Sequence, residues 1–348
     1  MVATAESEHL PAGWLRGPGF DLTFIAGISA VALLSGAIVV ADPRLFLPIL
    51  LIDLWLLGYH HVISTYTRLC FDAESRRQHA FLLYGLPPLV VVGTLLVAVG
   101  LGAWAIPTIY LYWQWFHYTR QSWGVSQVYR RKAGAGFVEH EWLAKAALYL
   151  LPLWGILYRS YQSPETFLGM EIWTLPVPGW VVDLSAVAAL STVALWGALR
   201  VRAWMRGCLP LAHTLYMISH FAIFYVGYIA IEDITHGWLV INIWHNAQYV
   251  LFVWLFNSNR YKDGIDPKAR FLSYISQPNR MWLYFAVCIA LSTAIYLSIE
   301  GVIDLFGSWA LPLTLLVYQS INFHHYIVDS LIWKVRKKPL QKTLGIAA

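Results

Sequence analysis

Charged residues are scarce in this chain of 348 residues, because Asp, Glu, Lys and Arg together make up 12% of it, against about 25% in an ordinary soluble domain. Hydrophobic residues make up 58%. A soluble protein of this length needs more polar surface than that, whereas a lipid bilayer accepts an apolar outer surface. The composition therefore argues against a soluble globular protein and predicts an integral membrane protein. Its first expected partner is the lipid bilayer.

Cysteines and nucleotide-binding motifs are scarce as well. Cys70, Cys208 and Cys288 are odd in number and form no CxxC motif, which argues against a disulfide framework or a cysteine-based metal site. The sequence has no GxGxxG fingerprint. If the chain carries out redox chemistry, we therefore expect its electrons to come from a separate cytosolic donor. The net charge of +5 comes from short basic loops and predicts no nucleic-acid partner.

Long apolar stretches are abundant. About ten of them approach the ~20 residues that a helix needs to cross the hydrocarbon core. They cover residues 20–41, 45–66, 80–101, 104–124, 142–161, 179–199, 209–231, 238–257, 281–300 and 308–332. The predicted fold is an all-α, polytopic membrane helical bundle of about ten transmembrane helices.

The basic residues predict the orientation of this bundle. Of the 24 lysines and arginines, Arg44 alone falls in a loop on the far side, and Arg120, Lys145 and Arg159 fall inside predicted spans. All the others lie in the two tails or in alternate loops on the same side as the tails. Cytoplasmic loops collect Lys and Arg, so we expect both termini in the cytoplasm. The predicted organisation is a cytoplasmic N-terminal tail (1–19), a single transmembrane domain (20–332) and a basic cytoplasmic tail (333–348).

Eight of the 12 histidines fall inside five of the predicted spans: His60, His61, His117, His213, His220, His245, His324 and His325. Counted along the helices, all eight lie ~6 to 18 Å from the cytoplasmic ends, and therefore in one leaflet. A single membrane histidine is usually a hydrogen-bonded helix contact. Eight at a shared depth indicate a common function, because an ionisable group in hydrocarbon is costly without a partner.

Polar residues at helical spacing accompany these histidines, and we predict that they orient the imidazoles. Asp53 precedes His60 by seven residues; Arg120 and Gln121 follow His117 by three and four; Gln248 follows His245 by three; and Asp329 follows His325 by four. Two other interpretations stay open. Arg120 would serve equally well to pair with lipid headgroups, and Asp329 would offset the charge of Lys334 or Arg336.

Imidazole-rich sites suit iron, zinc and copper, whereas calcium and magnesium prefer oxygen ligands. Eight imidazoles exceed the roughly four ligands of one tetrahedral zinc ion. The sequence therefore predicts a cofactor of two transition-metal ions, iron first, with zinc or haem as alternatives.

The pairs His60-His61 and His324-His325, together with the number and depth of the histidines, resemble the sites of membrane-bound, histidine-cluster di-iron desaturases and hydroxylases. The HxxxH and HxxHH boxes of that class are not present in this sequence. The resemblance implies an integral membrane metalloenzyme, a di-iron oxygenase, hydroxylase or desaturase that acts on a lipid-like or apolar substrate.

Two other functions fit the same residues. Opposed histidines also serve as axial ligands in a haem-binding membrane electron-transfer protein. Polar groups within the membrane also act as a relay in a proton-coupled transporter.

Overall fold

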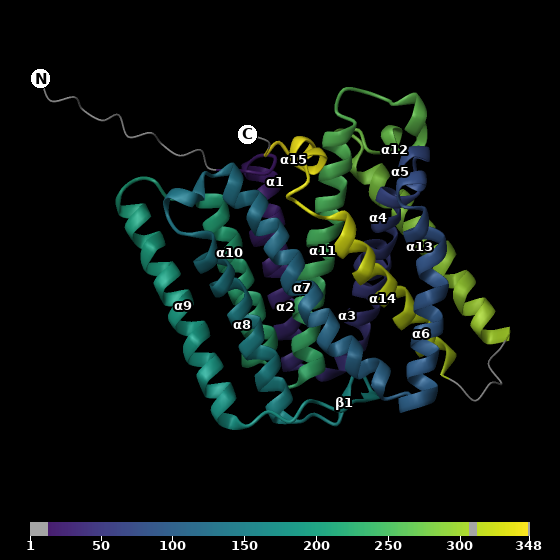
Figure 1. Ribbon diagram of the computed structural model, residues 1–348, viewed down its shortest axis with the longest axis horizontal. Helices are drawn as coiled ribbons and strands as arrows, with labels where there is room; N and C mark the ends of the chain where they lie inside the picture. Colours follow the sequence, from purple (N-terminus) through teal and green to yellow (C-terminus); the bar gives the residue numbers. More distant parts are fainter. Residues whose placement is uncertain (1–12, 306–311, 347–348) are drawn as a thin grey trace, which may run out of the picture.

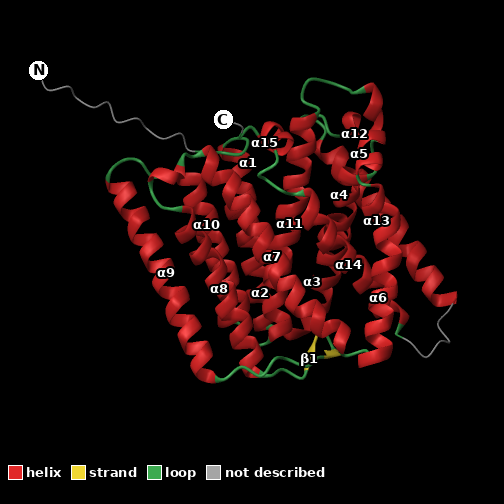
Figure 2. Cartoon of the chain, in the orientation of Figure 1, coloured by secondary structure: helices red, strands yellow, loops and turns green. Residues whose placement is uncertain are grey.

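The computed structural model describes residues 13–305 and 312–346, and almost all of them are helical (Figure 2). This confirms the predicted all-α class. In the part of the chain that is described, the only sheet is a two-stranded antiparallel hairpin of β1 (Thr166–Phe167) and β2 (Met170–Glu171). Helix is the expected form for an apolar chain in lipid, because it satisfies every backbone hydrogen bond within one segment.

The α-helices are α1 (Pro18–Leu22), α2 (Ile28–Ala41), α3 (Phe46–Asp53), α4 (Tyr59–Leu69), α5 (Ala73–Gln78), α6 (Leu86–Leu101), α7 (Ala105–Lys132), α8 (Glu141–Gln162), α9 (Gly179–Met205), α10 (Leu211–Tyr225), α11 (Ile234–Arg260), α12 (Arg270–Ile275), α13 (Met281–Leu305), α14 (Leu313–Ile332) and α15 (Lys338–Leu344). In the described ranges, four π-helical turns lie within or next to these helices: η1 (Thr23–Gly27), η3 (Leu54–Gly58), η4 (Phe81–Gly85) and η6 (Val226–Ala230). The same residues contain three short 3₁₀ turns: η2 (Pro43–Leu45), η5 (Ala135–Phe137) and η7 (Pro267–Ala269).

Six helical runs among the described residues are long and apolar enough to cross a membrane: Pro18–Ala41, Pro43–Leu69, Phe81–Leu101, Gly179–Met205, Ile234–Arg260 and Met281–Asp304. In five of them no more than 39% of the apolar window is buried, so they present apolar side chains on the outside of the bundle. The exception is α11, whose window is 89% buried. This helix therefore lies inside the bundle, where it packs against α2, α4 and α10 (Figure 1).

The other predicted spans coincide with α7, α8, α10 together with η6, and α14, which carry more polar residues. Residues 308–311 of the last predicted span lie outside the described residues, as do 1–12 of the N-terminal tail and 347–348 of the C-terminal tail.

The two ends of the bundle differ in composition. Figure 1 shows α1, α5, α12 and α15 at one end and the β1–β2 hairpin at the other. The first end carries Arg76 and Arg77 of α5, Arg270 of α12 and Lys338 of α15. We call it the basic end. Segments that the sequence assigns to one side of a membrane therefore lie together in space.

Candidate metal centre

Four histidines from four helices bring their imidazole rings together inside the bundle: His61 of α4, His117 of α7, His245 of α11 and His325 of α14. The ring centroid of His61 lies 4.5 Å from that of His325 and 4.8 Å from that of His245. The centroid of His117 lies 5.2 Å from that of His325 and 5.0 Å from that of His245. His61 and His117 are 6.4 Å apart. We call this group the four-histidine cluster.

The cluster is buried, and several of its nitrogen atoms have no hydrogen-bond partner among the described residues. None of the four side chains is more than 7% exposed. Within the described part of the chain, Nδ1 of His61, Nε2 of His117 and Nδ1 of His245 are buried without a partner. An unpaired buried polar atom is costly, and a bound cation removes that cost for a nitrogen lone pair.

Ligand atoms of three of the four histidines and of Asp329 form a group that could hold a metal ion, and His245 is linked to this group by the ring distances given above. His61, His117, His325 and Asp329 each offer one ligand atom, and these atoms all lie within 4.8 Å of one another. Nε2 of His61 and Nε2 of His325 face each other at 2.7 Å. The second carboxylate oxygen of Asp329 lies 3.5 Å from Nε2 of His325, as expected for residues four apart on one helix.

A hydrogen-bonded chain holds His325 and Asp329 in place. The hydroxyl of Tyr249 donates to Oδ1 of Asp329 at 2.7 Å and accepts from Nε1 of Trp333 at 3.0 Å. Oγ1 of Thr65 lies 2.7 Å from the Tyr249 hydroxyl and 3.0 Å from Nδ1 of His325. Because the Tyr249 proton goes to Asp329, Thr65 donates to Tyr249 and accepts from Nδ1 of His325. In this tautomer Nε2 of His325 carries no proton, so it accepts from Nε2 of His61 and would offer the same lone pair to a bound ion.

The ring of Tyr249 adds a packing contact. It stacks on His61 with the ring centroids 4.0 Å apart and the planes 8° from parallel. Sequence reasoning did not single out Thr65 or Trp333 as members of the site. Their signal is helical spacing, since Thr65 follows His61 by four residues and Trp333 follows Asp329 by four.

The other four membrane histidines lie elsewhere, so the eight that were predicted to act together divide into two sets. His60 lies against Phe285 of α13, with ring centroids 5.5 Å apart. Nε2 of His324 bonds to the carbonyl of Leu82 at 2.7 Å. Successive residues on a helix point about 100° apart. Only one member of each adjacent pair, His61 and His325, therefore faces the centre.

Both histidines of α10 are engaged in structural contacts outside the cluster. Nδ1 of His213 lies 2.9 Å from Nη2 of Arg200. His220 bonds through Nδ1 to Ser122 at 2.8 Å and through Nε2 to the carbonyl of Leu148 at 2.9 Å. The prediction of two metal ions rested on eight imidazoles that act together. In the structure, four of these imidazoles lie together and the other four lie elsewhere.

The predicted orienting residues also separate. Asp53 accepts from Nδ2 of Asn242 at 2.6 Å, and Oδ1 of Asn242 accepts from the hydroxyl of Tyr118 at 2.6 Å. The ring of Tyr118 lies 4.1 Å from that of His245. The hydrogen bonds of the described residues thus connect Asp53 to the cluster through two intermediaries, Asn242 and Tyr118. The π-helical turn η3 stands between Asp53 and His60 and changes the helical phase, so the seven-residue spacing does not put them on one face.

Three further predicted residues support the surroundings of the cluster in different ways. Nε2 of Gln121 donates to the backbone carbonyl of His245 at 3.2 Å. Nη2 of Arg120 donates to the carbonyl of Ser330 at 2.9 Å. Gln248 accepts from the hydroxyl of Tyr216 at 3.3 Å. Among the described residues, Gln248 forms no hydrogen bond to any of the four imidazole rings.

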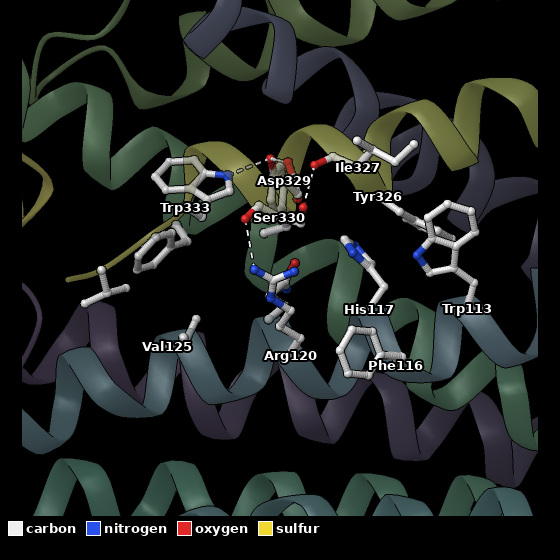
Figure 3. A pocket seen from close by; sticks show the side chains of 15 residues that line it. Trp113, Phe116, His117, Arg120, Val125, Tyr326, Ile327, Asp329, Ser330 and Trp333 are labelled. Carbon is white, nitrogen blue, oxygen red and sulfur yellow. Dashed lines mark hydrogen bonds between the residues drawn. The ribbon is translucent and has the colours of Figure 1, made fainter. Parts of the chain in front are cut away.

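A cavity between α7 and α14 reaches the cluster at His117 and also touches Asp329 beside it (Figure 3). Its walls are mainly aromatic, including Trp113, Phe116, Phe252, Tyr326 and Trp333. Arg120, Gln121 and Ser330 are its main polar residues besides the site itself. A second cavity touches His61, His245 and His325 from another side, and tyrosines and asparagines such as Tyr59 and Asn242 line it.

Comparisons of this chain with protein-family models, with curated proteins and with solved structures found no match. The interpretation of the site therefore rests on its own geometry.

Proposed function

We propose that this chain is an integral membrane metalloprotein in which the four-histidine cluster binds one transition-metal ion, with Asp329 beside it as a fifth ligand or as a hydrogen-bonded anchor. The observation that carries the proposal is the convergence of four buried imidazoles, among which Nε2 of His117 and Nδ1 of His245 have no hydrogen-bond partner among the described residues. Neutral imidazole is a good ligand for iron, copper and zinc.

The spacing of the rings supports a single ion. With metal–nitrogen bonds of about 2.1 Å, each ring centroid lies about 3.2 Å from the ion. Four rings at right angles in one plane then stand about 4.6 Å apart when adjacent and about 6.5 Å apart when opposed, whereas a tetrahedral arrangement spaces every pair about 5.2 Å apart. The four adjacent pairs in the cluster are 4.5, 4.8, 5.0 and 5.2 Å apart. The opposed pair, His61 and His117, is 6.4 Å apart.

The same packing favours a bare ion over haem. A haem iron takes its two axial ligands from opposite faces of a porphyrin, which fills the plane between them. His61 and His117 are opposed, but His245 and His325 lie between them and their rings occupy that plane.

We further propose that the metal is iron and that the chain is a dioxygen-dependent oxidoreductase acting on an apolar substrate. Iron with imidazole ligands and open positions supplies dioxygen activation when bound. In a hydroxylation, one C–H bond, one dioxygen, two electrons and two protons give one alcohol and one water. The aromatic cavity supplies a water-poor place for the substrate next to the ligands.

The proposed topology has ten membrane-spanning helices with the basic end in the cytoplasm. It is supported by the ten helical runs that coincide with the predicted spans and by the basic segments that gather at one end. In this orientation the cluster lies in the cytoplasmic half of the bundle, because His61 and His325 are less than three turns from the basic ends of α4 and α14. An electron donor in the cytosol is then closer to the cluster than a donor on the other side of the membrane.

Metal analysis of the purified chain tests the proposal. Protein isolated from iron-supplemented cells in detergent should contain one iron per chain and should consume dioxygen when it receives a reductant and a lipid-like substrate. Protein that is folded but binds no transition metal, even after incubation with iron, zinc or copper, would remove the metalloprotein proposal and leave the transporter interpretation.

A further inference from the structure

Arg120 is a charged residue in a cavity rich in aromatic side chains, and it shares this cavity with the carboxylate of Asp329, whose Oδ1 accepts from Tyr249. In the described residues no carboxylate lies within 4.0 Å of its guanidinium nitrogens, since Arg120 forms none of the ion pairs found there. Its one hydrogen bond uses Nη2 and the carbonyl of Ser330. A guanidinium has five N–H groups in a fixed fork, so most of its donors stay available to a ligand.

The cavity around Arg120 is suited to an acyl chain. Trp113, Phe116 and Val125 of α7 line one side, and Ile327 and Trp333 line the other. Figure 3 shows Arg120 extending from α7 toward Ser330 of α14, with His117 beside it. Phe116 lines the cavity and its side chain is 44% exposed, so the cavity opens to the surface of the bundle at this residue. The cavity therefore reaches an apolar outer surface, the side from which a lipid would enter.

We propose that this cavity binds a long-chain fatty acid, with the carboxylate on Arg120 and the hydrocarbon chain between α7 and α14. One guanidinium matches one carboxylate in charge and in its two-pronged geometry. A phosphate dianion needs more positive charge, since Arg120 is the only lysine or arginine among the described residues that line the cavity and the lining also includes the carboxyl group of Asp329. The ligand is thus identified by one negative charge and a long apolar chain.

The position of Arg120 sets the orientation of the fatty acid. Arg120 follows His117 by three residues on α7, which is about 4.5 Å along the helix axis. Its partner Ser330 follows Asp329 directly in the chain. The carboxyl end of the fatty acid, and not its methyl end, therefore lies next to the four-histidine cluster. This inference rests on the proposed function only in taking the cavity to be the substrate pocket.

Binding measurements with matched ligands test this inference. The probes are radiolabelled palmitate, hexadecanol, which has the same chain without the charge, and hexadecyl phosphate, with empty nanodiscs subtracted as background. We expect Arg120→Gln to weaken palmitate binding at least tenfold and to leave hexadecanol binding unchanged. The control is Arg44→Gln, because Arg44 is an exposed residue paired with Asp42 away from the cavity. It should bind palmitate as the unmodified chain does.

A second variant keeps the test decisive if Arg120→Gln does not fold. A Cβ added at Gly124, which lines the cavity, meets nothing within 4 Å. Gly124→Leu should therefore fold and should weaken palmitate and hexadecanol together by filling the cavity. Palmitate affinity that does not change in either variant would overturn the inference. Tighter, Arg120-dependent binding of hexadecyl phosphate than of palmitate would also overturn it, in favour of a phosphate ligand.

The binding measurements are repeated on metal-free protein. This distinguishes a failure of the proposed metal site from a failure of the proposed fatty-acid site. Arg120-dependent palmitate binding in a chain that takes up no metal would refute the proposed function and support the fatty-acid site. One bound ion together with palmitate binding that does not depend on Arg120 would give the reverse result.

Discussion

The adjacent histidines of α4 provide the sharpest test of which imidazoles hold the metal. His60 and His61 are each 2% exposed, and they differ in direction, since His60 lies against Phe285 and His61 faces His325. Truncating either one to Ala removes a buried ring of the same size, so both variants should lose a similar stability, about 2–5 kcal/mol. The two variants should differ only in metal binding.

The expected size of that difference follows from the ligand count. His61→Ala removes one of four imidazoles, and we expect the metal affinity to fall at least tenfold, because even changes to the neighbours of a ligand cost 10–100-fold. His60→Ala should retain full occupancy. The second adjacent pair repeats the experiment, with loss for His325→Ala and retention for His324→Ala.

The assay is metal content by mass spectrometry, combined with competition against a chelator of known affinity, on protein whose helical content matches the unmodified chain. Equal losses in His60→Ala and His61→Ala would refute the assignment, since the lost occupancy would then reflect damage to the fold. Full occupancy in both variants would show that His61 is not a ligand.

Three further predictions concern the surroundings of the cluster. Tyr249→Phe removes the hydroxyl that donates to Asp329, and chelator competition should show metal affinity about 10–100-fold lower; unchanged affinity would show that this hydrogen bond does not support the site. Asp53→Asn should change metal affinity less than about twofold, because the hydrogen bonds of the described residues connect Asp53 to the cluster through Asn242 and Tyr118; a tenfold loss would place Asp53 in direct contact with the ion. Gly237→Ala should lower the Tm and cost about 1–3 kcal/mol or more, since its Cβ would lie 2.0 Å from the carbonyl oxygen of Gly227; Gly93→Ala, whose Cβ meets nothing within 4 Å, is the matched control, and equal Tm values would contradict the close packing of α11 on η6.

Much of the architecture was predictable because lipid imposes strong constraints on sequence. An apolar run of membrane length has to be helical, and the helices of the structure coincide with the predicted stretches to within a few residues at most ends. The end of α7 is the largest difference. It continues to Lys132, eight residues past the predicted limit, because residues after Gly124 such as Val125 and Tyr129 remain buried against the bundle.

The depth of the site histidines in the membrane was predictable from the sequence, whereas the direction of their side chains was not. Counting residues along each span gives the height of an imidazole, and His61, His117, His245 and His325 lie at compatible heights. The direction of a side chain about its helix depends on which neighbour the helix packs against and on its phase. The π-helical turn η3 shifts that phase just before His60 and His61, and such a turn has no clear sequence signal.

Asp329 and Tyr249 illustrate the same difference. The spacing of Asp329 and His325 on one helix is fixed by local geometry, so their proximity follows from the sequence. The bond from Tyr249 to Asp329 joins residues of α11 and α14, which are 80 positions apart, and depends on how those two helices pack.

X-ray absorption spectroscopy at the edge of the bound metal tests the central claim most directly. One ion held by the four-histidine cluster should give a first shell of nitrogen and oxygen at about 2.0–2.2 Å and outer scattering from several imidazoles. It should give no metal–metal distance near the 3.5–4 Å of two-metal sites. A sulfur ligand, a metal–metal vector or a first shell without imidazole would contradict the account.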